Sequence, residues 1–287
     1  MVEVLVHFVA PALVGVLIGI ASGLLGIGGG TVMVPIFRLA FGMSATVSTA
    51  TSLFAIIPTS ISGAISHVKG KTCIPALGIA AGLGGACLSP VGVWLAQLSP
   101  DWLVMLAAAL IIGYSAINMF KKAFKLRPAS QPAAGVDAAA AASLTSLGEP
   151  AAAAPTADDS SLSRKQLLQG AAIGLVAGLA SGYVGVGGGF IMVPLMLSII
   201  GIPMRKASGT SLIAVMILAI PGVIEQGIIG NINYLAGIAI VIGTIPGAVI
   251  GARLVTKVPE RTLRLLFGCF LIVAAVMLVL NEVGIFG

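Results

Sequence analysis

The stretch GVLIGIASGLLGIGGGTVMVP at Gly15–Pro35 returns in the second half of the chain as GLVAGLASGYVGVGGGFIMVP at Gly174–Pro194. Twelve of the 21 aligned positions are identical, and the alignment pairs Gly15 with Gly174. The same spacing aligns the sequence ATSL at Ala50–Leu53 with GTSL at Gly209–Leu212. The chain therefore carries an internal duplication. In an apolar chain, two copies that each contain a glycine-rich break are typical of a membrane transporter.

The composition is that of a protein embedded in lipid. Of 287 residues, 58% are apolar and only 8% are charged, whereas soluble domains have about 25% charged residues. Uncharged runs at 4–33, 73–99 and 234–252 exceed or approach the roughly 20 residues that span a bilayer. We expect an all-α, polytopic integral membrane protein surrounded by membrane lipid. The net charge of +6 comes from Lys and Arg beside the apolar segments, so we expect no nucleic-acid partner.

Each half contains about five apolar segments, of which the second is short. They are expected at 4–25, 31–42, 45–66, 73–97 and 102–122, and again at 166–184, 190–201, 205–227, 233–255 and 261–281. A helix of twelve residues rises about 18 Å, too little for a hydrocarbon core of about 30 Å. The glycine cluster before each short segment is expected to break the helix, so that the first two segments meet or fold back at membrane depth.

Positive charges predict how the halves insert. In the first half they follow the third and fifth segments, whereas in the second half they precede the first and surround the connections near 203–206 and 253–264. Under the positive-inside rule this pattern gives two inverted-topology repeats, with both termini extracytoplasmic. We expect membrane repeat 1 at 1–127 and membrane repeat 2 at 164–287. The Ala/Pro-rich segment 128–163 has no apolar periodicity and no aromatic residue, so it cannot bury enough surface to offset its ordering entropy. We expect it to be a disordered cytoplasmic linker.

The glycine clusters are the first candidates for a binding site. Glycine unwinds a helix at low cost, and unwound backbone at membrane depth is tolerated where it is buried in protein or lines a cavity. The short helix that follows would point its partially positive N-terminus at an anion. The alternative is that these glycines only permit close helix packing, a role that better fits Gly15, Gly19, Gly23, Gly174, Gly178 and Gly182. The candidate residues in the clusters are Gly26, Gly28, Gly29, Gly30 and Thr31, with Gly185, Gly187, Gly188 and Gly189.

Paired hydroxyls are the second candidates. Thr51 and Ser52 correspond to Thr210 and Ser211, and each pair lies about 10 Å below the start of its segment by helical rise. These hydroxyls would donate to an oxyanion near the midplane. The alternative is that they bond the carbonyl four residues earlier in their own helix.

The predicted spans lack the residues that proton coupling, metal binding or catalysis would need. No Asp or Glu lies near the centre of one, which removes the embedded carboxylate that proton-driven carriers often use. His67 and Lys69 are expected to be interfacial anchors at the cytoplasmic mouth. Three cysteines without metal-ligand spacing are read as core residues, so we expect no metal, no cofactor and no catalytic residue.

The duplicated GIGGG-x-x-x-V-P and GVGGG-x-x-x-V-P elements, each followed by ATSL or GTSL, resemble the TauE/SafE sulfite exporter family, also called the toluenesulfonate uptake permease family. The resemblance covers roughly residues 5–127 and 164–283. It implies a plasma-membrane carrier of sulfite, organosulfonates or related sulfur oxyanions, and it leaves the particular substrate open.

We therefore expect a secondary transporter, most simply an exporter, that moves a small sulfur oxyanion by alternating access. The main alternative is an anion channel with the GxGGG backbone as a passive filter. A membrane enzyme would need a nucleophile with an acid–base partner, which the spans do not offer. A scaffold role gives no reason for two glycine breaks within the bilayer. Because small-xxx-small helices pack within or between monomers, a homo-oligomer stays open.

Overall fold

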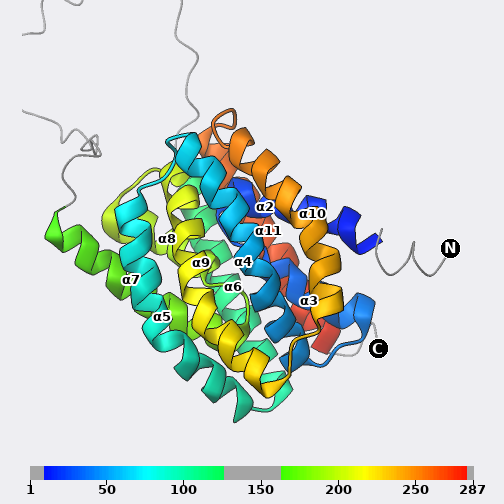
Figure 1. Ribbon diagram of the computed structural model, residues 1–287. Helices are drawn as coiled ribbons and strands as arrows, with labels where there is room; N and C mark the ends of the chain where they lie inside the picture. Colours follow the sequence, from blue (N-terminus) through cyan, green and yellow to red (C-terminus); the bar gives the residue numbers. More distant parts are fainter. Residues whose placement is uncertain (1–9, 126–162, 283–287) are drawn as a thin grey trace, which may run out of the picture.

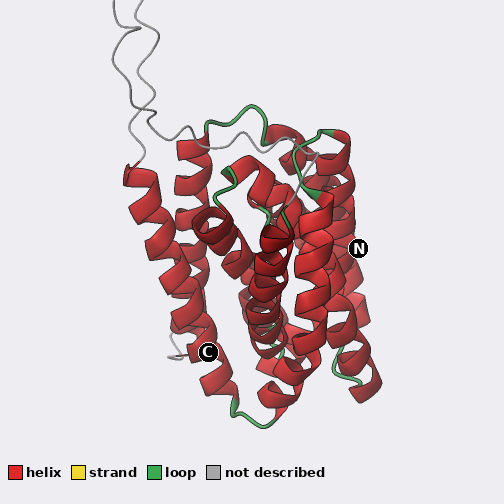
Figure 2. Ribbon diagram, turned by 90° about the vertical axis from the view of Figure 1, so that its left-hand side faces the viewer, coloured by secondary structure: helices red, strands yellow, loops and turns green. Residues whose placement is uncertain are grey.

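Every secondary-structure element that the computed structural model describes, over residues 10–125 and 163–282, is a helix (Figure 2). The first half has α2 (Ala10–Leu25), α3 (Gly30–Phe41), α4 (Ala45–Lys69), α5 (Pro75–Gln97) and α6 (Asp101–Lys125). The second half has α7 (Arg164–Val184), α8 (Gly189–Leu195) with the π-helix η2 (Met196–Ile200), α9 (Met204–Ile229), α10 (Tyr234–Leu254) and α11 (Glu260–Glu282). In this part of the chain seven helices are long and apolar enough to cross a membrane, namely α4, α5, α6, α7, α9, α10 and α11. The all-α, polytopic membrane class is therefore confirmed.

The helices follow the sequence duplication closely. The first residues of α3, α4, α5 and α6 are the duplication counterparts of the first residues of α8, α9, α10 and α11, and the last residue of α2 is the counterpart of the last residue of α7. The short second segment is present twice, as α3 and as the continuous helical stretch Gly189–Ile200. The expected linker, 128–163, lies outside the described residues except for Ser163, which caps the start of α7.

Contacts between helices show the direction in which each runs. A Cβ at Gly63 would lie 2.9 Å from Leu212, and a Cβ at Gly222 would lie 3.5 Å from Leu53, so α4 and its counterpart α9 are antiparallel. In contrast, α2 runs parallel to α10, and α7 runs parallel to α5, because their contacts advance together along both chains. The counterparts α4 and α9 therefore run in opposite directions, and the pairs α2–α10 and α5–α7 that join the halves match each other, as an approximate two-fold relation between the halves requires.

Small residues hold the parallel pairs together. A Cβ at Gly19 of α2 would lie 2.4 Å from the carbonyl oxygen of Thr244 in α10, and one at Gly178 of α7 would lie 2.1 Å from that of Gly85 in α5. No side chain fits at such distances, so glycine permits backbone-to-backbone packing. The packing role expected for this series is confirmed at Gly15, Gly19, Gly23, Gly174, Gly178 and Gly182.

One side of the molecule gathers the positive residues. Because α4 and α10 run opposite to α7 and α9, the ends of the first pair and the starts of the second lie together, at the upper left of Figure 1. Lys69, Arg253, Arg164 and Arg205 lie at these helix ends. We call this side the basic face, and the other side, where α4 begins and α9 ends, the opposite face.

Two carboxylates act as matching helix caps on the two faces. Asp101 accepts a hydrogen bond from the backbone N–H of Ala45 at 3.3 Å, and Glu260 accepts one from the N–H of Met204, also at 3.3 Å. Both donors are the first residues of their helices, where an acidic group is favourable. The repeated Pro-Asp and Pro-Glu pairs thus fix the start of α6 to α4 and the start of α11 to α9.

Candidate functional site

The two glycine clusters adopt matching left-handed backbone conformations. Gly28 and Gly29 have φ values of 81° and 87°, and their counterparts Gly187 and Gly188 have 86° and 67°. Residues with a side chain rarely adopt this region, whereas glycine enters it without steric cost. Gly26 and Gly185 share it, at 76° and 72°. The clusters end α2 and α7 and allow α3 and α8 to start in a new direction.

The two breaks face each other at the middle of the molecule. A Cβ at Gly30 would lie 2.5 Å from the carbonyl oxygen of Val186, and a Cβ at Gly189 would lie 2.5 Å from that of Gly26. Helix α3 therefore begins against the second break, and α8 begins against the first. Since α3 leads to the start of α4 and α8 leads to the start of α9, the two half-helices leave the centre toward opposite faces.

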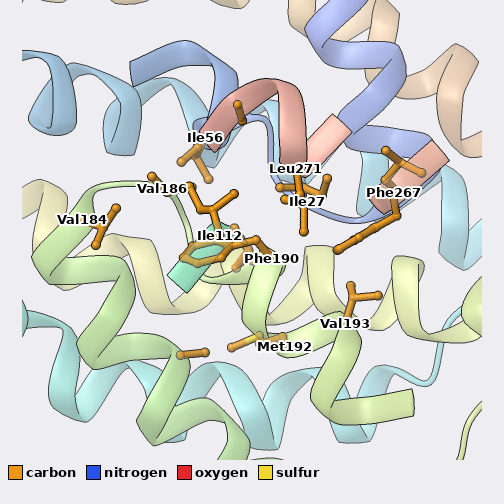
Figure 3. Packing of buried hydrophobic residues seen from close by; sticks show 14 of the residues in the cluster. Ile27, Ile56, Ile112, Val184, Val186, Phe190, Met192, Val193, Phe267 and Leu271 are labelled. Carbon is orange, nitrogen blue, oxygen red and sulfur yellow. The ribbon is translucent and has the colours of Figure 1, made fainter. Parts of the chain in front are cut away.

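Two matched apolar side chains fill the space between the breaks. Ile56 and Val215 are counterparts in the duplication and lie near the middle of α4 and α9. A Cβ at Gly28 would lie 2.9 Å from Val215 and 3.3 Å from Ile56, and one at Gly187 would lie 2.8 Å from Ile56 and 3.5 Å from Val215. Figure 3 shows Ile56 next to Val186 of the second break. Gly28 and Gly187 therefore lie level with the middle of α4 and α9, and both are buried.

The broken backbone leaves hydrogen-bond donors without acceptors. Within the described residues, the N–H groups of Gly28, Gly29, Gly187 and Gly188 have no acceptor. Neither α3 nor α8 has a side chain that caps its N-terminus. Buried N–H groups are nearly always paired, so these four groups are candidate donors for a binding site between the breaks.

Orphaned serine hydroxyls lie next to these donors. The side chains of Ser22, Ser60 and Ser181 are fully buried, and their hydroxyls have no hydrogen-bond partner. A Cβ at Gly28 would lie 3.4 Å from the Ser60 hydroxyl. Ser22 and Ser181 are counterparts in the two repeats, at positions identical in the duplicated stretch, and they lie beside Gly29 and Gly188. Neither serine is among the residues predicted from the sequence, and their recurrence four residues before each cluster is the signal that marks them.

The threonine and serine hydroxyls that the sequence predicted for one site have different surroundings in the structure. Ser211 donates to the carbonyl oxygen of Gly26 at 2.7 Å and so lies at the first break. Thr31 and Ser52 are fully buried, and their hydroxyls have no partner. The remaining two threonines serve neighbouring helices, because Thr51 accepts from the N–H of Asn233 at 3.0 Å and Thr210 accepts from that of Ile74 at 2.9 Å.

His67 is not the interfacial anchor that the sequence suggested. It is fully buried near the end of α4, where Nε2 donates to the carbonyl oxygen of Gly23 at 2.8 Å and Nδ1 contacts the Thr72 hydroxyl at 2.7 Å. The imidazole therefore ties the last turn of α2 to α4 and to the α4–α5 connection. The sequence could not show this, because the partner carbonyl lies 44 residues away.

The arrangement is suited to a compact anion. Backbone N–H groups and hydroxyls are neutral donors, and in a buried site several of them can surround an oxyanion without an ion pair. Two half-helices add their partially positive N-termini from opposite sides. Among the described residues no group of His, Cys, Asp or Glu is placed to hold a metal ion.

Opposed half-helices at mid-depth, in a fold of two related five-helix halves, define a polytopic membrane transporter. The profile of the family described as sulfite exporter TauE/SafE matches residues 11–278. The chain belongs to this family.

Curated relatives agree with this class. A probable membrane transporter protein of Bacillus subtilis, YunE, is 27% identical over 97% of this chain and 99% of its own length. Another from the same organism, YdhB, is 26% identical over 88% of this chain and 92% of its own. A probable membrane transporter protein of Haemophilus influenzae is 28% identical over 94% and 97%. Comparison with the solved structures gives no significant match.

Proposed function

We propose that the protein carries a small sulfur oxyanion, sulfite or an organosulfonate, across the plasma membrane and binds it between the two glycine breaks. The observation that carries this proposal is the set of unpaired donors at mid-depth, namely the N–H groups of Gly28, Gly29, Gly187 and Gly188 with the hydroxyls of Ser22, Ser60 and Ser181. Sulfite and sulfonate groups have several acceptor oxygens, which match such donors. The description of the family supports the same substrate class.

The matched, oppositely oriented halves support transport by alternating access. Ile56 and Val215 occupy the space between the breaks, so substrate entry requires the half that carries one of them to move away. Movement of one half relative to the other would open the centre toward the basic face, and the symmetry-related movement would open it toward the opposite face. Thr31, Ser52 and Ser211 would contribute further contacts as the breaks separate.

The distribution of charge sets the orientation that we propose. Under the positive-inside rule the basic face is cytoplasmic, which places the linker in the cytoplasm and both termini outside. The membrane potential, negative inside, drives an anion outward with about 2.3 kcal/mol per charge per 100 mV. Export is therefore the direction that the potential favours without a coupling ion.

The test is flux of radiolabelled sulfite into proteoliposomes made with the full-length protein. The double variant Ser22→Ala with Ser181→Ala removes two donors, and hydrogen bonds to a charged group contribute about 1.5–3 kcal/mol each. We expect KM to rise at least about tenfold. Because both hydroxyls are orphaned, thermal stability without substrate should stay the same or rise.

Ser198→Ala is the matched control, because this serine already donates to the carbonyl oxygen of Pro194 at 2.6 Å. An unchanged KM in the double variant would contradict the proposed site. Counterflow exchange in the same vesicles distinguishes the carrier from the channel, since trapped unlabelled sulfite accelerates labelled uptake only through a carrier.

A further inference from the structure

A crevice of about 540 Å³ lies on the basic face, between the ends of α4 and α10. Its first lining residue in α4, Ser62, follows Ile56 by six residues along the helix. Its lining comes from the last turns of the two helices and from the residues that follow them. These residues are Ser62, Ile65, Ser66, Lys69, Gly70, Val249, Ala252, Arg253 and Thr256.

The crevice brings together two cations from different halves of the chain. Lys69 ends α4 and Arg253 lies in the last turn of α10, and both side chains are exposed. Neither is paired with a carboxylate in the described part of the chain. Two free cations that line one concave site attract a group with more than one negative or acceptor oxygen, such as a phosphate.

The pseudo-symmetry supplies an internal comparison. The equivalent crevice on the opposite face, about 440 Å³, is lined by Pro90, Val91, Trp94 and Glu225. Trp94 takes the place of Arg253 and Glu225 that of Ser66, since the duplication aligns the members of each pair. The helix packing therefore creates a crevice on both faces, whereas the positive charge is specific to the basic face.

The surroundings of the crevice are apolar and face outward. Ile61 and Ile65 of α4 are 39% and 50% exposed, and Ile245 and Ile250 of α10 are 40% and 49% exposed. On a helix that crosses a membrane, exposed side chains of this kind contact lipid tails. A ligand that fills the crevice and continues along this surface would need an anionic head and an apolar tail.

We propose that this crevice binds an anionic phospholipid of the leaflet at the basic face. Its phosphate lies between Lys69 and Arg253, and an acyl chain follows Ile65 and Ile245. Basic sites between membrane helices on the cytoplasmic side are suited to such headgroups. Because α4 belongs to the first half and α10 to the second, the bound lipid bridges the two halves on one face only. The proposal is independent of the transported substrate.

The experiment measures thermal unfolding of the full-length protein in phosphatidylcholine-containing micelles, with and without added phosphatidylglycerol. We expect phosphatidylglycerol to raise the Tm by several degrees, and we expect the rise to disappear in the variant Lys69→Gln with Arg253→Gln. The control Lys71→Gln with Lys257→Gln removes two cations near the same helix ends that do not line the crevice, and it should keep the full rise.

Three results would overturn the proposal. One is an equal rise in both double variants, which would indicate a non-specific surface charge effect. The second is a Tm of the variant Lys69→Gln with Arg253→Gln that is lower than that of the unchanged protein by the same amount with and without phosphatidylglycerol. This result would mean that the two cations only offset the helix dipoles. The third is an equal rise with soluble inorganic phosphate or sulfite, which would mean that the crevice binds a free anion.

Discussion

At the scale of single residues, the glycine clusters combine two separate requirements. Gly28 and Gly187 need a positive φ, and both also lie against Ile56 and Val215. Gly30 lacks the positive φ but lies against the carbonyl of Val186, so it is required for space alone. Substitutions at these positions can therefore separate the cost of the positive φ from the cost of losing close packing.

The variant Gly28→Ala is expected to be destabilised more than Gly42→Ala. Both positions have a positive φ, 81° and 61°, and a left-handed alanine costs about 1–2 kcal/mol. A Cβ at Gly42 meets nothing within 4 Å, whereas one at Gly28 lies 2.9 Å from Val215. Overpacking adds roughly 1–3 kcal/mol at Gly28, which thermal unfolding of the two variants would measure. Equal losses of stability would show that the centre is loosely packed.

At the scale of elements, the pairs α2–α10 and α5–α7 are held by backbone contact between small residues. Lipid tails are as apolar as the helix surfaces, so close packing rather than hydrophobic burial stabilises these pairs. Each pair joins one half to the other, and each brings the helix before a glycine break against its neighbour. The position of the breaks therefore depends on these two pairs.

Gly19→Ala in α2 is expected to be strongly destabilising, because its Cβ would lie 2.4 Å from the Thr244 carbonyl oxygen and 2.8 Å from the Thr244 Cα. Both atoms belong to backbone, so α2 and α10 would have to separate. Gly113→Ala in α6 is the control, since a Cβ there meets nothing within 4 Å. That change should be neutral or stabilising by up to about 1 kcal/mol through helix propensity. Detergent thermal stability checks both; a mild effect at Gly19 would refute the close packing of this pair.

At the scale of the whole molecule, the two faces share the same helix packing but differ in the charge of their side chains. The same helix packing produces the Lys69/Arg253 crevice on one face and the Trp94/Glu225 crevice on the other. The centre, by contrast, keeps matched glycines, serines and apolar side chains from both halves. The duplication thus preserves these central positions, while the two faces differ in charge.

The proposed orientation predicts opposite labelling of the two faces. In a variant whose three cysteines are replaced by alanine, Ser99→Cys reports the opposite face and Lys257→Cys reports the basic face. A membrane-impermeant maleimide added to intact cells should label the first and spare the second until the membrane is permeabilised. Labelling of Lys257→Cys in intact cells would reverse the assigned orientation.

The sequence predicted the elements well because duplication and hydropathy are local signals. The short second segments were expected at 31–42 and 190–201, and the helical stretches are Gly30–Phe41 and Gly189–Ile200. Glycine clusters and long apolar runs act on a few neighbouring residues, so their effect can be read along the chain. The family followed from the same motifs.

The sequence by itself determined the helical membrane class, the two related halves and the glycine breaks, because each depends on neighbours in the chain. Only the tertiary structure decided which hydroxyls serve which purpose. Thr51 and Thr210 hold the N-terminal ends of α10 and α5, whereas Ser22 and Ser181 lie unpaired beside the breaks. These roles depend on partners that are far away in the chain, such as Asn233, which lies 182 residues from Thr51. A hydroxyl has the same local pattern whether or not a distant N–H group reaches it, so only the packing of the helices distinguishes the two cases.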